Sequence, residues 1–175
     1  MEIWDLYDKN RTKTGETAVR GEERIPSGRY HIVVHAAVFN DRGEMLIQQR
    51  QPWKDVFPDL WDISVGGSAV AGEDAPTACF RELREEVGLS LEEIKNGRAV
   101  FTVNFGSGFD DYFVAHWKGD PASLTLQDRE VKAVRFASRE EIAAMTREGT
   151  FIPYHPGLVD LLFLYSAGTS IYEWK

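Results

Sequence analysis

The segment from Gly66 to Leu89 constrains the fold of this chain more than any other stretch. It opens as a glycine-rich loop, GGSAVAGED, and continues in a helical pattern, APTACFRELREEVGL. An α-helix turns about 100° per residue, and three glutamates therefore share one side of it: Glu82, Glu85 and Glu86. Apolar residues form a second stripe, typical of a helix packed on a core: Pro76, Cys79, Phe80, Leu83 and Val87. The pattern predicts a helix with one face on the core and one acidic face free.

The acidic face is a candidate metal site. Carboxylates that lie close together repel one another unless a cation sits between them. Carboxylate oxygens, backbone carbonyls and water are the ligands that Mg²⁺ and Mn²⁺ prefer, and glycines such as Gly66 and Gly67 expose backbone carbonyls. The alternative is a solvated surface on which the acids pair with Arg81 and Arg84 along the helix.

The spacing of these residues resembles the Nudix box. Five residues separate Gly67 from Glu73, and seven more lead to the run RELREEVGL, Arg81 to Leu89. This resemblance implies an α/β fold, an α/β/α sandwich with a mixed central sheet. It also implies that the box, residues 67–89, holds a divalent metal, Mg²⁺ or Mn²⁺, against a diphosphate.

The resemblance assigns roles to individual residues of the box. Glu82, Glu85 and Glu86 would be metal ligands or their immediate catalytic partners, and Gly67 would contribute a carbonyl. A further pair would brace the loop against the helix, a structural role: Glu73 and Arg81.

Length and composition limit the class of protein. A chain of 175 residues, 43% of them hydrophobic, predicts a single domain over residues 1–175. It has no apolar run of about 18 residues and no secretory signal pattern at its start, so we expect no membrane association and a cytoplasmic protein. The 28 acidic and 20 basic residues give a net charge of −8, which disfavours nucleic-acid binding. Cys79 is the only cysteine and is expected to be a buried thiol.

The rest of the sequence predicts strands mixed with short helices. An N-terminal β-hairpin is expected over residues 1–19, around a turn at 8–15. Further strands are expected at 31–39, 45–49, 61–65, 100–105, 111–117 and 131–136. One helical turn is expected at 91–96. A capping box at Ser138 and Glu141 predicts a helix through Met145, and a last helix is expected at 157–165 with Leu158, Leu161, Leu162 and Tyr165 on one face.

A second resemblance extends beyond the box. The run from His31 to Gly67 is similar to the corresponding part of isopentenyl-diphosphate isomerases, which places the chain near the isomerase-like Nudix proteins. This likeness implies that Arg50 and Lys54 contact a substrate diphosphate. It also makes His31 a candidate metal ligand, although a histidine at the start of an apolar strand is more often structural.

The chain departs from the isomerases at the residues that flank Gly67. Isomerases carry a catalytic cysteine before this glycine and a metal-binding histidine after it, whereas this chain has Gly66 and Ser68. Glycine has no group that protonates or deprotonates an allylic carbon, so the sequence argues against isomerisation. Asp110 and Asp111 lie where the family often supplies an extra acidic ligand or base, and the alternative is that they are ordinary turn acids.

The leading hypothesis is a metal-dependent pyrophosphohydrolase that cleaves a diphosphate joined to a group X, as in a nucleoside diphosphate. The alternatives are an isopentenyl-diphosphate isomerase and a sensor that binds a diphosphate metabolite without turnover. The expected partner is a small-molecule diphosphate, and the N-terminal hairpin offers an edge for a homodimer. Nothing in the sequence identifies X.

Overall fold

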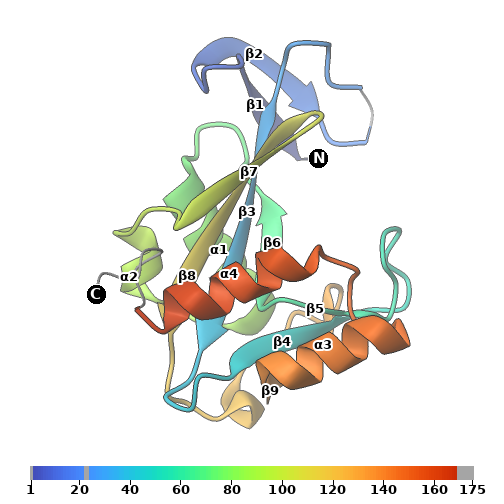
Figure 1. The fold of residues 1–175 in the computed structure, drawn as a ribbon. Coiled ribbons are helices and arrows are strands. Elements are labelled where there is room, and N and C mark those ends of the chain that lie inside the picture. Colours follow the sequence, from blue (N-terminus) through green and yellow to red (C-terminus); the bar gives the residue numbers. More distant parts are fainter. Residues whose placement is uncertain (1, 22–23, 169–175) are drawn as a thin grey trace.

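A mixed β-sheet forms the centre of the molecule (Figure 1). The computed structural model describes residues 2–21 and 24–168. Its main sheet has seven strands in the order β5-β4-β3-β8-β7, with β6 paired to β3 and β9 paired to β4. The strands are β3 (His31–Phe39), β4 (Met45–Arg50), β5 (Trp61–Asp62), β6 (Val65–Ser68), β7 (Phe101–Phe105), β8 (Gly108–His116) and β9 (Val131–Ala137).

Strand β3 is in the middle of the strand order and pairs along both of its edges. One edge runs parallel to β8 from His31 to Phe39. The other edge is shared: β6 pairs with Val33 to Ala36, and β4 pairs at Phe39 alone. The sheet therefore divides beyond β3 into a branch with β6 and a branch with β4, β5 and β9.

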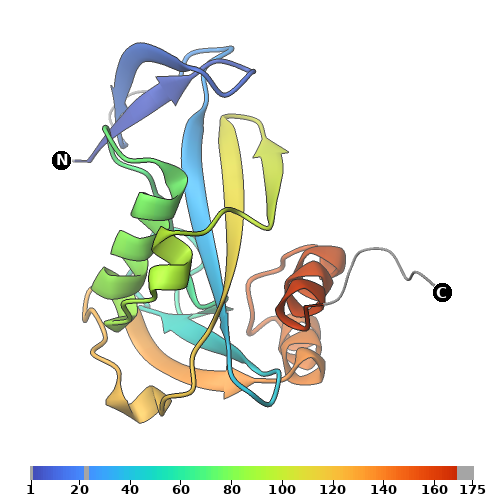
Figure 2. The same ribbon diagram turned by 90° about the vertical axis from the view of Figure 1, so that its left-hand side faces the viewer.

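Helices cover both faces of the sheet (Figure 2). The helices α1 (Ala75–Val87) and α2 (Glu92–Lys95) lie on one face, and α3 (Arg139–Glu148) and α4 (Pro156–Ser166) lie on the other. Side chains alternate across a strand, so Val34 and Val38 of β3 join the core beneath α1, whereas Ala37 and Phe39 join the core beneath α3 and α4. This arrangement confirms the predicted α/β/α sandwich with a mixed central sheet.

Helix α1 begins and ends at the residues that its sequence specifies. The Asp74 side chain accepts a hydrogen bond from the Thr77 amide at 3.0 Å, and Pro76 fits the first turn, where no intrahelical amide bond is made. Gly88 ends the helix with a φ of 74°, a left-handed conformation that glycine adopts at little cost. Cys79 is 1% exposed, and burial raises the pKa of its thiol.

The N-terminal β-hairpin is also confirmed. It consists of β1 (Ile3–Tyr7) and β2 (Lys13–Val19), which form a separate two-stranded sheet. The hairpin lies against the loop at residues 66–74, because the Ala71 amide donates to the Ile3 carbonyl at 2.7 Å and the Gly72 amide donates to the Asp5 carboxylate at 2.8 Å. The hairpin is thus part of the surroundings of the box.

The strand predicted at 61–65 is instead two strands that pair with different partners. Strand β5 pairs with β4, and β6 pairs with β3. Ser64 lies between them, accepts a hydrogen bond from the Val38 amide at 2.8 Å and donates to the Leu46 carbonyl at 2.5 Å. The prediction failed because apolar periodicity does not reveal where a chain changes partner.

The face predicted for the last helix is wrong in part. Leu162 is buried as expected, but Leu161 is 39% exposed and Val159 is buried in its place. Apolar residues surround almost the whole of α4, so periodicity alone does not select the core-facing side. In the part of the chain that the structure describes, no helix combines the length and the apolar character needed to cross a membrane.

Candidate active site

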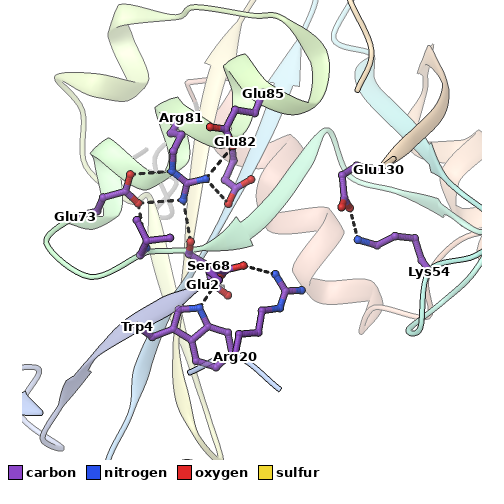
Figure 3. Close-up of polar contacts among 11 residues, drawn as sticks. Glu2, Trp4, Arg20, Lys54, Ser68, Glu73, Arg81, Glu82, Glu85 and Glu130 are labelled. Atoms are coloured by element: carbon purple, nitrogen blue, oxygen red, sulfur yellow. Dashed lines mark hydrogen bonds and ion pairs between the residues drawn. The ribbon is translucent and has the colours of Figure 1, made fainter. Parts of the chain in front are cut away.

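Arg81 is the centre of the polar contacts that join the box loop to α1 (Figure 3). Its guanidinium donates to both oxygens of Glu73 at 2.8 and 3.0 Å and to the Ser68 carbonyl at 3.0 Å. It also donates to Glu82 at 2.9 Å and to Glu85 at 3.2 Å. The hydrogen bonds with Glu73 raise the pKa of Arg81 further above its ordinary value. Loop and helix are therefore held together by one charged side chain.

Glu82 packs directly on Gly67. A Cβ atom at Gly67 would lie 2.2 Å from the carboxyl carbon of Glu82, so any side chain at this position would displace the carboxylate. The Glu82 side chain is 14% exposed. Burial raises its pKa to about 7, although Arg81 opposes the shift. The loop and the helix thus place a partly desolvated carboxylate against a glycine backbone.

Glu86 is buried, which corrects the expectation of a free acidic face. It is 6% exposed, and the Gln48 side chain of β4 donates to its carboxylate at 3.0 Å. The backbone amide of Gln127 donates to the backbone carbonyl of Glu86 at 2.9 Å. The segment around Gln127 therefore also lies against α1 at Glu86. Burial, together with the charge of Glu82, raises the pKa of Glu86 well above its ordinary value. Only Glu85 is substantially solvated, with its side chain 44% exposed.

A cavity of about 230 Å³ lies over these residues. It brings together the box carboxylates, the box glycines and several cations from distant parts of the chain. The lining residues are Glu2, Arg20, Arg50, Lys54, Gly66, Gly67, Ser68, Arg81, Glu82, Glu85, Glu86, Gln127 and Glu130. The cavity is therefore lined by every residue that the sequence analysis assigned to metal or diphosphate binding, except His31, Asp110 and Asp111.

The carboxylates fit a hard divalent cation in their chemistry. Within residues 2–21 and 24–168, no three His, Cys, Asp or Glu side chains are positioned to coordinate one metal ion. The box glutamates instead bind Arg81 and Gln48. Burial raises the pKa of both Glu82 and Glu86, and the Glu82 charge raises that of Glu86 further. A cation between them would relieve this repulsion and supply the charge that the buried carboxylates lack.

Arg50 and Lys54 reach the cavity but already have protein partners. Arg50 donates to the Val56 carbonyl at 3.0 and 3.2 Å and to Asp62 at 3.4 Å. Lys54 forms an ion pair with Glu130. A substrate phosphate would compete with these acids for the two cations.

The structure adds cavity residues that the sequence analysis did not find. Arg20 and Glu2 come from the N-terminal hairpin and form an ion pair at 2.7 Å, and Trp4 donates to Glu2 at 2.7 Å. Figure 3 shows the Arg20 side chain directed between the Arg81 contacts and the Lys54–Glu130 pair. Gln127 and Glu130, which also line the cavity, were missed as well, and so was Gln48, which binds Glu86. No sequence motif marks these residues, because only the tertiary fold brings them to the box.

His31 lies outside the cavity. Its ring stacks on Trp4 with 4.3 Å between centroids and meets the Phe105 ring edge-on at 5.7 Å. Burial lowers its pKa. Its Nδ1 is buried without a hydrogen-bond partner among the described residues. The structure therefore does not bring His31 to the box glutamates.

Asp110 and Asp111 also lie outside the cavity, on opposite faces of β8. Asp111 is 1% exposed and binds Arg11 of the hairpin turn at 2.9 Å and Thr102 at 2.6 Å. Asp110 binds His35 at 2.6 Å on the other face. Both carboxylates are therefore engaged within the protein.

Comparison with known proteins settles the family. A model of the NUDIX domain matches residues 29–155. The chain belongs to the NUDIX family. It is 42% identical to a protein named as an uncharacterized Nudix hydrolase from Listeria innocua over 98% of this chain and 99% of that protein. It is 41% identical to one from Listeria monocytogenes over the same shares. These matches identify the chain as a Nudix hydrolase.

Solved structures share its fold. The crystal structure of DR0079 from Deinococcus radiodurans superposes with a TM-score of 0.73 at 22% identity, covering 92% of this chain and 97% of that one. A MutT protein from Methanosarcina mazei gives a TM-score of 0.62 at 24% identity, covering 76% and 92%. At these identities the likeness shows the fold alone.

Proposed function

We propose that this Nudix hydrolase is a metal-dependent pyrophosphohydrolase that cleaves the phosphoanhydride of a diphosphate joined to a group X. One observation carries the proposal: the box glutamates and three cations, Arg20, Arg50 and Lys54, line the same cavity. An acidic cluster without cations would repel a diphosphate, and cations without the acids would bind it without activating water.

The box residues would hold Mg²⁺ or Mn²⁺. The ligands we propose are Glu82, Glu85, Glu86 and the Gly67 carbonyl, and a bound divalent cation would neutralise phosphoryl oxygens and activate water. Arg81 keeps Glu82 and Glu85 on the cavity side, and Gln48 orients Glu86.

Substrate phosphates would be bound by cations that leave their present acidic partners. Arg50 and Lys54 would exchange Asp62 and Glu130 for phosphate oxygens, with charge-assisted hydrogen bonds in both states. The proton of the attacking water would pass to a box glutamate, because Asp110 and Asp111 are bound to other side chains outside the cavity.

The geometry around Gly66 disfavours isomerisation. A Cβ atom at Gly66 would lie 2.6 Å from Cδ2 of His35, so a cysteine at this position would require the His35 ring to move. Cys79 is buried and does not line the cavity. We therefore retain the likeness of residues 31–67 to the isomerases only as support for the diphosphate contacts of Arg50 and Lys54.

Several broader expectations stay predictions. These are a single domain over residues 1–175, a cytoplasmic location, a small-molecule substrate without nucleic acid, and a homodimer. Measurable hydrolysis at saturating metal would exclude a sensor without turnover.

The test is a screen of purified protein for cleavage of the phosphoanhydride, with the phosphorylated products followed by phosphorus-31 NMR. The compounds are nucleoside di- and triphosphates, dinucleoside polyphosphates, nucleotide sugars, coenzyme A and isopentenyl diphosphate, each with Mg²⁺, with Mn²⁺ and with EDTA. The proposal expects at least one diphosphate to be cleaved in a reaction that EDTA stops. Absence of metal-dependent cleavage across the whole panel would refute it.

A further inference from the structure

A second polar cluster lies behind Gly66, on the α4 face of the sheet. The His35 ring of β3 stacks on Tyr112 of β8 with 5.0 Å between centroids. Nδ1 of His35 lies 2.6 Å from one oxygen of Asp110, and the Tyr112 hydroxyl donates to the other oxygen at 2.7 Å. The imidazole is therefore fixed in position by an aspartate that is itself fixed by a tyrosine.

This cluster is continuous with a residue of the cavity. The Tyr154 ring meets the His35 ring edge-on at 6.3 Å, and its hydroxyl donates to Asp62 at 2.8 Å. Asp62 also accepts a hydrogen bond from Arg50 at 3.4 Å, and Arg50 lines the cavity. The charged and titratable groups around His35 are thus Asp110, Tyr112, Tyr154, Asp62 and Arg50.

The His35 ring lies directly against Gly66. A Cβ atom at Gly66 would lie 2.6 Å from Cδ2 and 2.8 Å from Nε2 of His35, and Gly66 itself lines the cavity. The His35 side chain is 14% exposed. Nε2 of His35 has no hydrogen-bond partner in residues 2–21 and 24–168. It is also not one of the fully buried atoms that lack a hydrogen bond. One hydrogen-bonding atom of fixed orientation therefore remains free beside the cavity.

The chemistry of this atom favours a polar neighbour. An imidazole Nε2 that lost its contact with water to a hydrocarbon would be left without a hydrogen bond, which is costly. A heterocyclic base or a hydroxylated sugar would replace the lost water contact.

We propose that His35, oriented by Asp110 and Tyr112, contacts the group X of the substrate and selects a polar X that forms hydrogen bonds over a hydrocarbon X. This inference rests on the proposed function, because it concerns the part of the same substrate that the box does not bind. Asp110 is then a positioning residue, rather than the extra metal ligand or base that the sequence suggested.

The first test compares substrates of the two kinds. Cytidine diphosphate and uridine-diphosphate glucose carry polar X groups of two different sorts, and isopentenyl diphosphate carries a hydrocarbon. We expect His35→Phe, which keeps an aromatic ring against Tyr112, to lower kcat/KM for the preferred polar substrate about 10- to 100-fold, chiefly through KM. The effect on isopentenyl diphosphate should be smaller than threefold. The matched control is His116→Phe, because His116 is exposed at the far end of β8 and should leave both values within twofold.

The second test does not depend on the folding of a His35 variant. In Glu86→Gln protein with Mg²⁺, the ¹⁵N resonance of His35 Nε2 should shift on addition of cytidine diphosphate or uridine-diphosphate glucose and not on addition of inorganic pyrophosphate.

The outcomes separate this inference from the proposed function. In the kinetic test, equal losses on polar and hydrocarbon substrates, or no loss on either, would overturn the role of His35. In the NMR test, the same follows if ligands that shift the amide resonances of residues 66–86 leave the Nε2 resonance of His35 unchanged. Either result would leave the proposed hydrolase activity intact. Failure of every compound to be cleaved or bound would overturn the proposed function and this inference with it.

Discussion

At the scale of single residues, the three box glutamates have different surroundings although they lie on one helix face. Glu85 is solvated, Glu82 packs on Gly67, and Glu86 is buried beneath Gln48. The sequence placed all three on one side of α1 but did not reveal this gradient, because the groups that bury Glu86 come from β4 and from the segment around Gln127.

Replacing Glu86 by Gln should abolish most activity without unfolding the protein. The amide keeps an acceptor for Gln48 and removes a buried charge, so stability in EDTA should not fall. The loss of a metal ligand or base is expected to lower kcat by about 10² to 10⁴. The measurement is kcat at saturating Mg²⁺, with Glu140→Gln on the exposed side of α3 as the control. A variant that kept more than half of the wild-type kcat would exclude a direct role for Glu86.

The raised pKa of Glu82 predicts how metal-free protein responds to pH. Burial raises this pKa from 4.5 to about 7, so the folded state binds the proton more tightly than the unfolded state. The free energy of unfolding should therefore fall, by roughly 1 to 3 kcal/mol, as pH rises from about 4.5 to about 7. Burial of Glu86 acts in the same direction.

Urea unfolding in EDTA at several pH values between 4.5 and 8 measures this effect. The decline should be shallower in Glu82→Gln, and Mg²⁺ should stabilise wild-type protein more at pH 8 than at pH 5, because protons compete with the metal. Parallel pH profiles for wild type and Glu82→Gln would show that Glu82 is not desolvated.

At the scale of elements, an ion pair with a buried aspartate helps to attach the N-terminal hairpin to the sheet. Arg11 at the hairpin turn binds Asp111, which is 1% exposed, and the base of the hairpin carries Glu2 and Arg20 to the cavity. The hairpin was predictable from its turn-rich segment and from the apolar residues of one arm. Its docking was not, because Arg11 and Asp111 are a hundred positions apart and no local pattern connects them.

Arg11→Ala should destabilise the protein by about 2 to 4 kcal/mol, because it leaves the buried Asp111 carboxylate without its counter-ion. Arg11→Ala combined with Asp111→Asn should recover part of this loss. Lys13→Ala is the control, since its exposed pair with Asp5 is worth about 1 kcal/mol or less. Urea denaturation of the four proteins gives the values. Equal effects of Arg11→Ala and Lys13→Ala would mean that the buried pair does not anchor the hairpin.

At the scale of the whole molecule, the box could be located from sequence, whereas the cavity could not. Local spacing predicts α1 and its glutamates, because those features depend on residues near one another in the chain. The other cavity walls come from the hairpin, from the loop that carries Lys54 and from the segment before β9. The division of the sheet at Ser64, which creates the β6 edge at the cavity, likewise depends on distant partners.

The arrangement of the whole cavity predicts that isopentenyl diphosphate is not isomerised. No thiol lines the cavity, and the space beside Gly66 is filled by His35. Proton NMR of isopentenyl diphosphate incubated with protein and Mg²⁺ should show no dimethylallyl diphosphate, and Cys79→Ser should behave as wild type because this thiol is buried. Protein-dependent formation of dimethylallyl diphosphate at a catalytic rate would show that the protein is an isomerase and would contradict the proposed hydrolysis.

The central claim is that the cavity uses a divalent metal and water to cleave a phosphoanhydride. Phosphorus-31 NMR of the best substrate from the screen, turned over in ¹⁸O-labelled water, tests it most directly. The diphosphate signals should give way to two monophosphate signals with the label in one product, only when Mg²⁺ or Mn²⁺ is present, and about 10²-fold or more slowly in Glu86→Gln. Cleavage that continues in EDTA, or products in which neither phosphate carries the label, would contradict this account.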